Sequence, residues 1–310
     1  MKIAVVGSYG VGLTMRVPHS PEPGETVSNG QFAEGPGGKG SNQAIAAARL
    51  GADVSFLTAV GDDDYGRAAA RLWQDEGVDA AKTLVTAEAA TMVGFILVEP
   101  SGENRIAIAP GALDLLDERA VEAFRDEIAA ADLLVVSMEI PMTAVVAALR
   151  VARESGTRTL LNPAPAYPLP DDAWPLIDVL TPNQTEAPIL LGLDAGHGLD
   201  DAALIAQLKG RTDASIVLTR GSAGALIADE TGLTEVAPVV VEHVVDTTGA
   251  GDSFTAALAV SLAEGRTLAE AAAYAARAGA HAVTIAGVIP ALPTPDQLTT
   301  VSATQTGATR

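Results

Sequence analysis

Short apolar stretches alternate with longer, helix-like stretches along most of the chain. Residues 3–6, 133–137 and 215–218 are almost wholly apolar, which is typical of strands buried on both faces. Stretches with apolar positions at helical spacing, such as 143–154 and 252–264, are interspersed with them. Strands that alternate with helices predict an α/β fold with a mostly parallel sheet that is covered by helices on both faces.

The same pattern predicts the remaining elements. We expect further strands at 53–60, 159–161 and 179–180, a hairpin over 225–235, and helices at 41–50, 67–76, 118–130, 186–191, 202–209 and 268–283. After Gln297 the chain is rich in Ser, Thr and Gly, so we expect this end to fray.

Two segments do not fit the regular alternation. Pro18, Pro21, Pro23 and Gly24 interrupt the first, and the second contains two apolar stretches on either side of a turn-like segment at 100–104. These features predict a small exposed sheet that stands apart from the core. We therefore divide the chain into a core of residues 1–10, 35–90 and 110–310 and a small β unit of residues 11–34 and 91–109.

Composition narrows the possible classes. The chain has 310 residues, of which 48% are hydrophobic and only 4% are aromatic, so a large core must be built mainly from aliphatic side chains. The absence of cysteine excludes disulfides, thiolate metal sites and a cysteine nucleophile. A formal net charge of −20 disfavours nucleic acid and anionic membranes as partners. Because no signal-peptide pattern or membrane-length apolar stretch is present, we expect a cytoplasmic protein.

The most informative local feature is segment 245–252, where small residues precede an acid. Gly249, Ala250 and Gly251 stand directly before Asp252, and an apolar helical stretch begins at this acid. Small residues let backbone N–H groups approach an anion, and a helix N-terminus adds partial positive charge. A carboxylate held there can take a proton from a hydroxyl during phosphoryl transfer. Taken alone, the segment fits an N-cap role for Asp252 equally well.

A second glycine-rich segment, residues 35–40, formally matches the G-x-G-x-x-G pattern of dinucleotide-binding folds. That pattern normally follows a buried first strand, but polar residues 28–34 precede it here. It is not a P-loop either, because Lys39 is followed by Gly40 and not by Ser or Thr. Close backbone approach, the Lys39 ammonium and the Asn42 amide suit a polyol beside a phosphate. The alternative is a tight turn with an exposed lysine.

Other titratable residues favour structural roles. No pair of histidines has the spacing of metal ligands (His19, His197, His243 and His281). Three consecutive acids, residues 62–64, follow a predicted strand end and are expected to form a solvated turn.

Two separated motifs resemble the signatures of one known family. Residues 37–44 (GGKGSNQA) resemble the N-terminal signature of ribokinase-like sugar kinases, the pfkB family, and residues 246–254 (DTTGAGDSF) resemble its C-terminal signature. Further segments resemble the same family in the same order: 162–166 (NPAPA), 181–186 (TPNQTE) and 219–224 (TRGSAG). The resemblance extends from Ile3 to Leu292 and favours the catalytic interpretation of Asp252 over the N-cap.

The resemblance implies a three-layer α/β/α core and identifies the small β unit as a lid. It implies an ATP-dependent kinase that transfers the γ-phosphate to a hydroxyl of ribose or a related sugar, with Asp252 as general base and Mg²⁺ as cofactor. It also implies that the lid packs in a homodimer. The partners are then a small sugar or nucleoside and ATP, with no nucleic acid and no membrane.

The resemblance assigns roles to further positions. The N–H groups of Gly249, Ala250 and Gly251 match the family's anion hole. Sugar-contacting positions are matched by Gly38, Lys39, Asn42 and Glu139. Nucleotide positions are matched by Asn183, Glu186, Thr219, Gly221, Ser222 and Gly224, of which Asn183 and Glu186 concern the ATP phosphates and Mg²⁺. A K⁺ site is matched by Asp246, Thr248, Ala282, Ile285, Gly287 and Ala291, with alanine at the last position where a hydroxyl is usual.

One departure from the family concerns the acceptor. Ribokinases have an Asn and an Asp after the first strand that grip sugar hydroxyls, and these substrate-binding positions are Gly10 and Gly12 here. Each charged hydrogen bond lost costs about 1.5–3 kcal/mol, and the two glycines are expected to open space. Another pentose, a hexose or a nucleoside therefore stays open as the acceptor, unless Tyr9 or Arg16 replaces the lost contacts. A non-catalytic sugar- or nucleotide-binding protein on the same fold is the alternative from another class.

Overall fold

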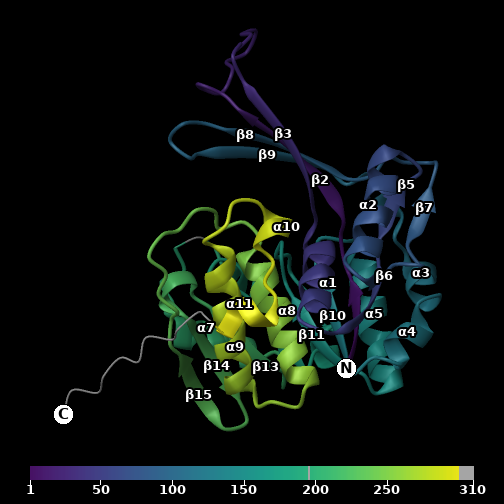
Figure 1. The fold of residues 1–310 in the computed structure, drawn as a ribbon. Coiled ribbons are helices and arrows are strands. Elements are labelled where there is room, and N and C mark those ends of the chain that lie inside the picture. Colours follow the sequence, from purple (N-terminus) through teal and green to yellow (C-terminus); the bar gives the residue numbers. More distant parts are fainter. Residues whose placement is uncertain (195, 300–310) are drawn as a thin grey trace.

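The computed structural model of the chain describes residues 1–194 and 196–299, and in this range most of the strands form one nine-stranded sheet (Figure 1). The strand order is β15-β14-β13-β12-β11-β10-β1-β4-β6. The strands span Lys2–Val6 (β1), Asp53–Leu57 (β4), Val78–Asp79 (β6), Leu133–Ser137 (β10), Arg158–Asn162 (β11), Val179–Leu180 (β12), Ser215–Thr219 (β13), Ala225–Asp229 (β14) and Gly232–Val236 (β15). All neighbours from β13 to β6 are parallel, whereas β14 and β15 add an antiparallel edge.

Helices cover both faces of this sheet. One face carries α1 (Lys39–Arg49), α2 (Asp64–Asp75), α8 (Ala250–Ala263) and α9 (Leu268–Ala282). The other carries α3 (Glu118–Glu122), α4 (Arg125–Ala129), α5 (Met142–Ser155), α6 (Glu186–Leu190) and α7 (Asp201–Lys209). Short helices α10 (Val288–Ala291) and α11 (Pro295–Thr299) follow α9. The predicted three-layer α/β/α fold is confirmed.

The two apolar layers follow from the two-residue period of the strands. On β1, Ile3 and Val5 pack toward α1 and α8, whereas Ala4 and Val6 pack toward the opposite helices. A strand that is apolar at every position therefore joins both cores, which is why the parallel strands read as continuous apolar stretches.

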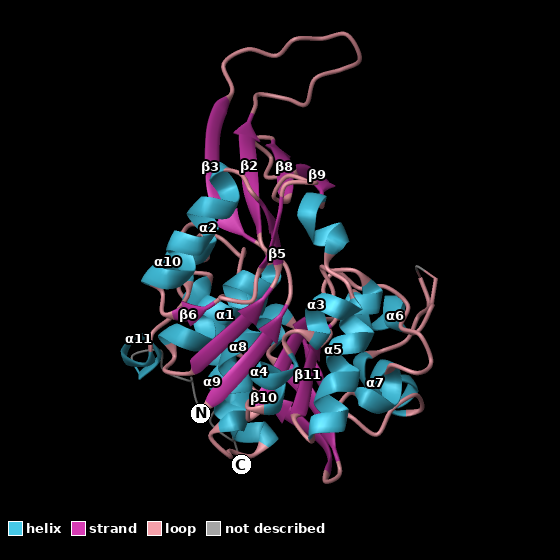
Figure 2. Ribbon diagram, turned by 90° about the vertical axis from the view of Figure 1, so that its right-hand side faces the viewer, coloured by secondary structure: helices cyan, strands magenta, loops and turns pink. Residues whose placement is uncertain are grey.

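A second, four-stranded sheet rises above the core (Figure 2). Its order is β3-β2-β8-β9, with strands at Gly10–Arg16 (β2), Gln31–Gly37 (β3), Val93–Val98 (β8) and Asn104–Ala109 (β9). Strand β3 continues to Gly37, so the boundary that we placed at residue 34 falls inside a strand. Two short strands, β5 (Ala59–Gly61) and β7 (Leu84–Thr86), pair separately. No helix in the described part of the chain is long and apolar enough to cross a membrane.

Two expected elements are each divided in the structure. The strand predicted at 53–60 is two strands, because β4 joins the main sheet while β5 pairs with β7. The helix predicted at 118–130 breaks into α3 and α4 at Phe124, whose backbone (φ −102°, ψ 8°) leaves the helical range while its ring is buried in the core. At the C-terminal end, Gln297 lies within α11, and residues from 300 onward lie outside the described residues.

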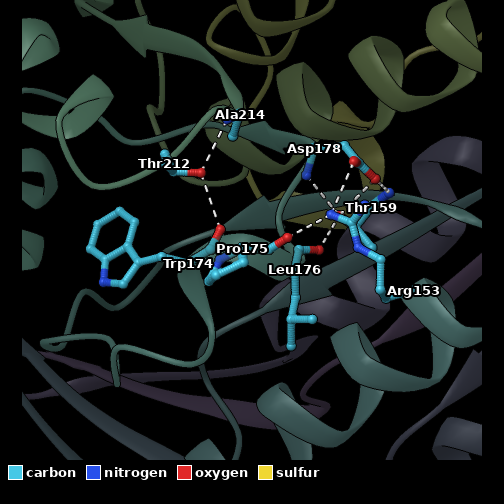
Figure 3. A network of polar contacts seen from close by, with 8 residues as sticks. All are labelled: Arg153, Thr159, Trp174, Pro175, Leu176, Asp178, Thr212 and Ala214. Carbon is cyan, nitrogen blue, oxygen red and sulfur yellow. Dashed lines mark hydrogen bonds and ion pairs between the residues drawn. The ribbon is translucent and has the colours of Figure 1, made fainter.

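A polar network joins the amino ends of β11 and β12 (Figure 3). This edge of the sheet is opposite the one where the parallel strands end. Asp178 accepts from the backbone N–H of Thr159 at 2.8 Å, and the Asp178 N–H donates to the Thr159 hydroxyl at 2.9 Å. Arg153 donates to the carbonyl of Pro175 at 2.6 Å, and Thr212 donates to that of Trp174 at 3.1 Å. These bonds satisfy backbone groups of the connection between the two strands.

The acidic turn at residues 62–64 contains Asp63, the N-cap residue of α2. Asp63 accepts from the Gly66 N–H at 2.8 Å and from both the N–H and the hydroxyl of Thr91 at 2.7 Å. Burial alone would raise the pKa of Asp63, but these hydrogen bonds outweigh it and hold the pKa below the usual value. Asp63 therefore joins the start of α2 to the segment that leads into β8.

The start of α1 depends on a backbone contact between two glycines. A Cβ at Gly40 would lie 2.5 Å from the carbonyl carbon of Gly7 and 2.6 Å from the Ser8 nitrogen, and a Cβ at Gly7 would lie 2.7 Å from the Gly40 Cα. The residue before the helix, Gly38, has φ +91°, a conformation that favours glycine. The end of β1 can therefore touch the first turn of α1 only because side chains are missing there.

We predict that Gly40→Ala destabilises the fold. Alanine favours a helix over glycine by about 1 kcal/mol, but the clash with Gly7 and Ser8 should outweigh this and cost about 2–3 kcal/mol net. Chemical denaturation measures the change in unfolding free energy. Gly94→Ala is the control, because its Cβ would meet nothing within 4 Å and should change stability by less than about 0.5 kcal/mol. Equal stability of the two variants would contradict the contact.

Candidate active site

The candidate site lies at one edge of the main sheet. Three predicted residues, Glu139, Asn183 and Thr219, stand just beyond or at the carboxyl ends of β10, β12 and β13, and Ser8 and Asn162 take the same place at β1 and β11. In open parallel sheets, ligands bind outside the carboxyl ends of the strands. Helices α1 and α8 also begin at this edge, since Lys39 bonds Glu139 and Asp252 bonds Asn42.

Asp252 lies in the first turn of α8 and is buried, with 7% of its surface exposed. The helix begins at Ala250, directly after Gly249, which adopts a left-handed conformation (φ 80°). A Cβ on Gly249 would lie 2.9 Å from Cγ1 of Val288, so both space and conformation require glycine there. No side chain caps this end of α8 in the structure as described. Gly251 in the same turn has open space at its Cβ position.

The Asp252 carboxylate is held by two amides of α1. Asn42 Nδ2 donates to Oδ2 at 2.8 Å, and Gln43 Nε2 donates to Oδ1 at 3.0 Å. The side chain therefore points across to α1 and does not cap its own helix. This geometry excludes the N-cap interpretation that the sequence left open.

Burial is the main influence on Asp252 and raises its pKa above the usual aspartate value. The charge of Lys39 and the two amide hydrogen bonds act in the opposite direction, while Glu139 adds to the increase. A buried carboxylate with a raised pKa and one nearby ammonium suits a general base.

Glu139 links β10 to the start of α1. Its Oε2 accepts from the Ser8 hydroxyl at 2.5 Å and from the Lys39 N–H at 3.1 Å. The Ser41 N–H donates to the Ser8 carbonyl at 2.9 Å. Gly38, the residue before α1, approaches Tyr9 so closely that a Cβ would lie 2.6 Å from the Tyr9 Cα. Ser8 therefore belongs to the structural base of this site, although the sequence did not single it out.

Asn183 and Glu186 bond each other reciprocally across the turn that leads into α6. The Asn183 Oδ1 accepts from the N–H of Glu186 at 2.8 Å, and the Glu186 carboxylate accepts from the Asn183 N–H at 2.8 Å. Burial raises the pKa of Glu186; the Asn183 N–H and Lys39 oppose this, and the charge of Asp252 adds to it. Lys39, Asp252 and Glu186 thus act on one another electrostatically across one site.

The segment after β13 lies beside Asn183. Thr219 forms a parallel bridge with Asn183, and its N–H donates to the Pro182 carbonyl at 2.9 Å. The chain then turns through exposed Ser222, with left-handed conformations at Gly221 (φ 55°) and Gly224 (φ 82°). A Cβ at Gly224 would collide with the Val236 carbonyl, so this turn needs glycine at that position.

Asp246 ties the segment before α8 to the segment before α10. Its Oδ1 accepts from the N–H (2.9 Å) and the hydroxyl (2.7 Å) of Thr248, and its Oδ2 accepts from the Gly287 N–H at 3.0 Å. Burial would raise the pKa of Asp246, but these hydrogen bonds and the charge of Arg16 hold it below the usual value. The backbone between α9 and α10 is also linked, since the Ile285 N–H donates to the Ala282 carbonyl at 3.3 Å.

The remaining predicted K⁺ position, Ala291, is buried in α10. No group of three or more His, Cys, Asp or Glu side chains within residues 1–194 and 196–299 is arranged to hold a metal ion. A K⁺ ion here would have to rely mainly on carbonyl oxygens, with Asp246 as the charged ligand.

Of the two predicted acceptor positions on β2, only one has the open space that the sequence led us to expect. A Cβ on Gly10 would lie 2.3 Å from Cε of Met92, so the side chain of buried Met92 occupies the volume. At Gly12 the nearest atoms are Cδ1 of Ile96 at 3.6 Å and a backbone oxygen at 3.8 Å, which leaves ordinary van der Waals room. Only Gly12 therefore has space for a larger side chain or ligand.

Tyr9 does not replace the lost acceptor contacts, because its ring packs in the core. It lies edge-on to Trp73 with ring centroids 5.2 Å apart, and burial raises the pKa of Tyr9 to about 12. The positive charge of Arg16 lowers the pKa of Asp246.

Two further residues of the site, Gln43 and Asn162, lie in the family-like motifs, but the sequence assigns them no role. Gln43 Nε2 lies 3.0 Å from Asn162 Oδ1 as well as from Asp252, and Asn162 donates to the Thr181 carbonyl at 3.3 Å. Both side chains are buried. Gln43 stands in an otherwise alanine-rich predicted helix. Because buried polar groups need partners, this pattern could have indicated a polar contact at Gln43.

Comparison with known proteins agrees with this geometry. Residues 1–295 match the model of the pfkB family carbohydrate kinases. The chain belongs to this family. A ribokinase of Schizosaccharomyces pombe is 36% identical over 302 residues, which cover 94% of this chain and 95% of that enzyme. A ribokinase of Haemophilus influenzae is 33% identical over 292 residues, with 94% and 95% covered.

A solved structure of Arabidopsis thaliana ribokinase complexed with ribose and ATP superposes with a TM-score of 0.89 at 26% identity and covers 97% of this chain and 98% of that one. This pfkB chain is accordingly a phosphotransferase that acts on a sugar hydroxyl.

We predict that Asp246→Ala loosens both segments that this carboxylate joins. Without the acceptor, the N–H groups of Thr248 and Gly287 lose their partner, and their exchange with solvent should accelerate about tenfold or more. Hydrogen exchange followed by mass spectrometry measures peptides that cover 245–249 and 283–288. Asp229→Ala is the matched control, because it removes the same local bonds to Thr231 at a distant hairpin. Unchanged exchange at 283–288 would contradict the link.

Proposed function

We propose that this pfkB chain transfers the γ-phosphate of ATP to a hydroxyl of ribose or a related sugar, with Asp252 as the general base. The observation that carries this proposal is the buried Asp252 carboxylate, which stands in the first turn of α8 directly after the backbone of 249–251. Base and anion site are then adjacent, so one end of a helix serves both needs of phosphoryl transfer.

In the proposed reaction, the acceptor hydroxyl gives its proton to an Asp252 oxygen. The acceptor oxygen attacks the γ-phosphorus at the same time, and ADP leaves. The backbone N–H groups of Gly249, Ala250 and Gly251 stabilise the negative charge that spreads over the transferred phosphoryl group. Gly38, Lys39, Asn42 and Glu139 would position the acceptor beneath the lid. The Lys39 ammonium and the start of α1 bring positive charge to the same place.

Asn183, Glu186, Thr219, Gly221, Ser222 and Gly224 would hold the nucleotide. The donor set fits Mg²⁺ bound mainly through ATP, because Glu186 is a single carboxylate and Mg²⁺ usually keeps several waters and substrate oxygens. When bound, Mg²⁺ supplies positive charge that offsets the phosphate oxygens. Within the protein, the Glu186 carboxylate accepts from the Asn183 N–H at 2.8 Å.

We further propose a K⁺ site at Asp246, Thr248, Ala282, Ile285, Gly287 and Ala291. The support is the Asp246 link between the two segments that border α8 and α10. A bound K⁺ would add positive charge beside the anion hole. We also propose a cytoplasmic location, in keeping with the absence of cysteine from the chain.

A homodimer through the lid is also proposed. Phe32 is paired with Met15, and Phe95 with Leu13, so both aromatic rings stand on one face of the lid sheet. Both rings are exposed. An exposed aromatic face on a small sheet suits packing against a second copy.

We predict that Asp252→Asn lowers kcat by about 10²–10⁴ while ATP binding changes little, because the amide cannot accept the hydroxyl proton. ADP release with a panel of pentoses, hexoses and nucleosides measures turnover, and calorimetry measures ATP binding. Asp117→Asn, which changes an N-cap on the opposite face of the sheet, should leave turnover unchanged. Full activity of Asp252→Asn would refute the base assignment, and turnover of nucleosides or hexoses alone would select the alternative acceptor class.

We predict that Gly12→Asp raises kcat/KM for ribose by about tenfold or more, because it adds a carboxylate that can accept from sugar hydroxyls. The space beside Gly12 admits the side chain, whereas any side chain at Gly10 meets Met92. Gly12→Asn is the isosteric control and should gain less, since it lacks the charge. If both variants match wild type on ribose, Gly12 does not face the acceptor.

A further inference from the structure

Gln43 is a buried side chain of the active site with no role in the proposed reaction. It lies in α1, is 1% exposed, and one nitrogen donates to two acceptors. The acceptors are Oδ1 of Asp252 and Oδ1 of Asn162, each 3.0 Å away. An NH₂ group carries two hydrogens, so both bonds can form at once.

The orientation of the Gln43 amide is set by its neighbours. Asn162 donates through Nδ2 to the carbonyl (3.3 Å) and hydroxyl (3.4 Å) of Thr181, which turns its own Oδ1 toward Gln43. Two acceptors then face the same point, and only the nitrogen of Gln43 can satisfy them. The bonds run from Thr181 beyond β12, through Asn162 at the end of β11 and Gln43 in α1, to Asp252 in α8.

The second amide on Asp252, that of Asn42, differs in what its nitrogen reaches. Asn42 donates to Asp252 Oδ2, whereas the Gln43 nitrogen bonds both Asp252 and Asn162 at a strand end. The oxygens of both amides, Asn42 Oδ1 and Gln43 Oε1, are buried without a partner among the described residues. A hydroxyl of the acceptor can supply the donor that Asn42 Oδ1 lacks, in keeping with the sugar contact proposed for Asn42.

Other charges act on the same carboxylate. Lys39 from α1 favours its ionised form, whereas Glu139 after β10 opposes it, and Glu186 in α6 is coupled to it. Burial opposes ionisation most strongly. A neutral donor at hydrogen-bond distance therefore matters for keeping Asp252 able to accept a proton.

We propose that Gln43 is a positioning residue, which anchors Asp252 Oδ1 to the strand ends through Asn162 and leaves Oδ2 for the acceptor hydroxyl. This inference rests on the proposed role of Asp252 as base. Gln43 fixes the direction of the carboxylate and favours its ionised form, while Oδ2, which accepts from Asn42, has a second lone pair for the acceptor hydroxyl.

Gln43→Met tests this, because methionine has similar length and no donor. Loss of the bond disfavours ionised Asp252, so the carboxylate stays protonated to higher pH. The acid limb of the kcat/KM profile should move upward by about one pH unit, and kcat at neutral pH should fall about tenfold or more while KM for ATP changes less than about twofold. Asn162→Ala should move the limb in the same direction by less, because Gln43 stays but loses its anchor.

A structural role alone would leave the pH profile unchanged. Ser41→Ala is the matched control: it removes a buried hydrogen bond of the same helix, from Trp73 Nε1 at 2.9 Å, and should leave the acid limb in place. Selectively ¹³C-labelled aspartate gives a second readout, since NMR follows ionisation of the Asp252 carboxylate without turnover, and Asp252→Asn assigns its signal.

The outcomes separate the two proposals. An upward shift of both the acid limb and the NMR titration in Gln43→Met supports the role of Gln43. An active wild type with an unshifted limb in both Gln43→Met and Asn162→Ala overturns that role alone. A wild type that phosphorylates no sugar or nucleoside overturns the proposed function, and the catalytic meaning of Gln43 with it, whatever the titration shows.

Discussion

A carboxylate buried in the core needs hydrogen-bond donors, and at Asp252 that need joins separate parts of the chain. Both donors come from consecutive residues of α1, whereas the acid belongs to α8, about two hundred residues later. Removing a carboxylate from water without partners is strongly unfavourable. The approach of α1 to α8 is therefore fixed by polar contacts as well as by alanine packing. The contact between Gly7 and Gly40 in turn sets where α1 begins.

The parts of the proposed site lie in two sheets. Asp252, the start of α8 and the Asn183–Glu186 pair stand on the main sheet and its helices, with bonds that run through strand ends. Two of the proposed acceptor positions, Gly10 and Gly12, stand on β2 of the small sheet, where Gly12 is bordered by one isoleucine and backbone. Under the proposed function, substitutions on that sheet would change which hydroxyls are bound without moving the Asp252 carboxylate.

Much of this was predictable from sequence because the local signals were strong. Continuous apolar stretches gave the parallel strands, and the glycine-rich motifs marked the starts of α1 and α8. The errors came from tertiary demands that no local pattern contains. Phe124 breaks the helix predicted at 118–130 while its ring joins the core, and the strand predicted at 53–60 continues into a different sheet. Met92 fills the space at Gly10, although it lies some eighty residues away in the chain. Such contacts follow from topology and not from periodicity.

The same limit explains why a role for Asp252 could be predicted from the sequence and a role for Gln43 could not. Asp252 stands in a segment where small residues, helix start and acid already make a chemical argument. Gln43 gains its meaning only from what lies across from it: Asn162 at a strand end and the carboxylate of another helix. In a core of small aliphatic side chains, its single amide joins the sheet to the Asp252 carboxylate at one point. The direction in which this carboxylate points is thus set by the ends of the strands.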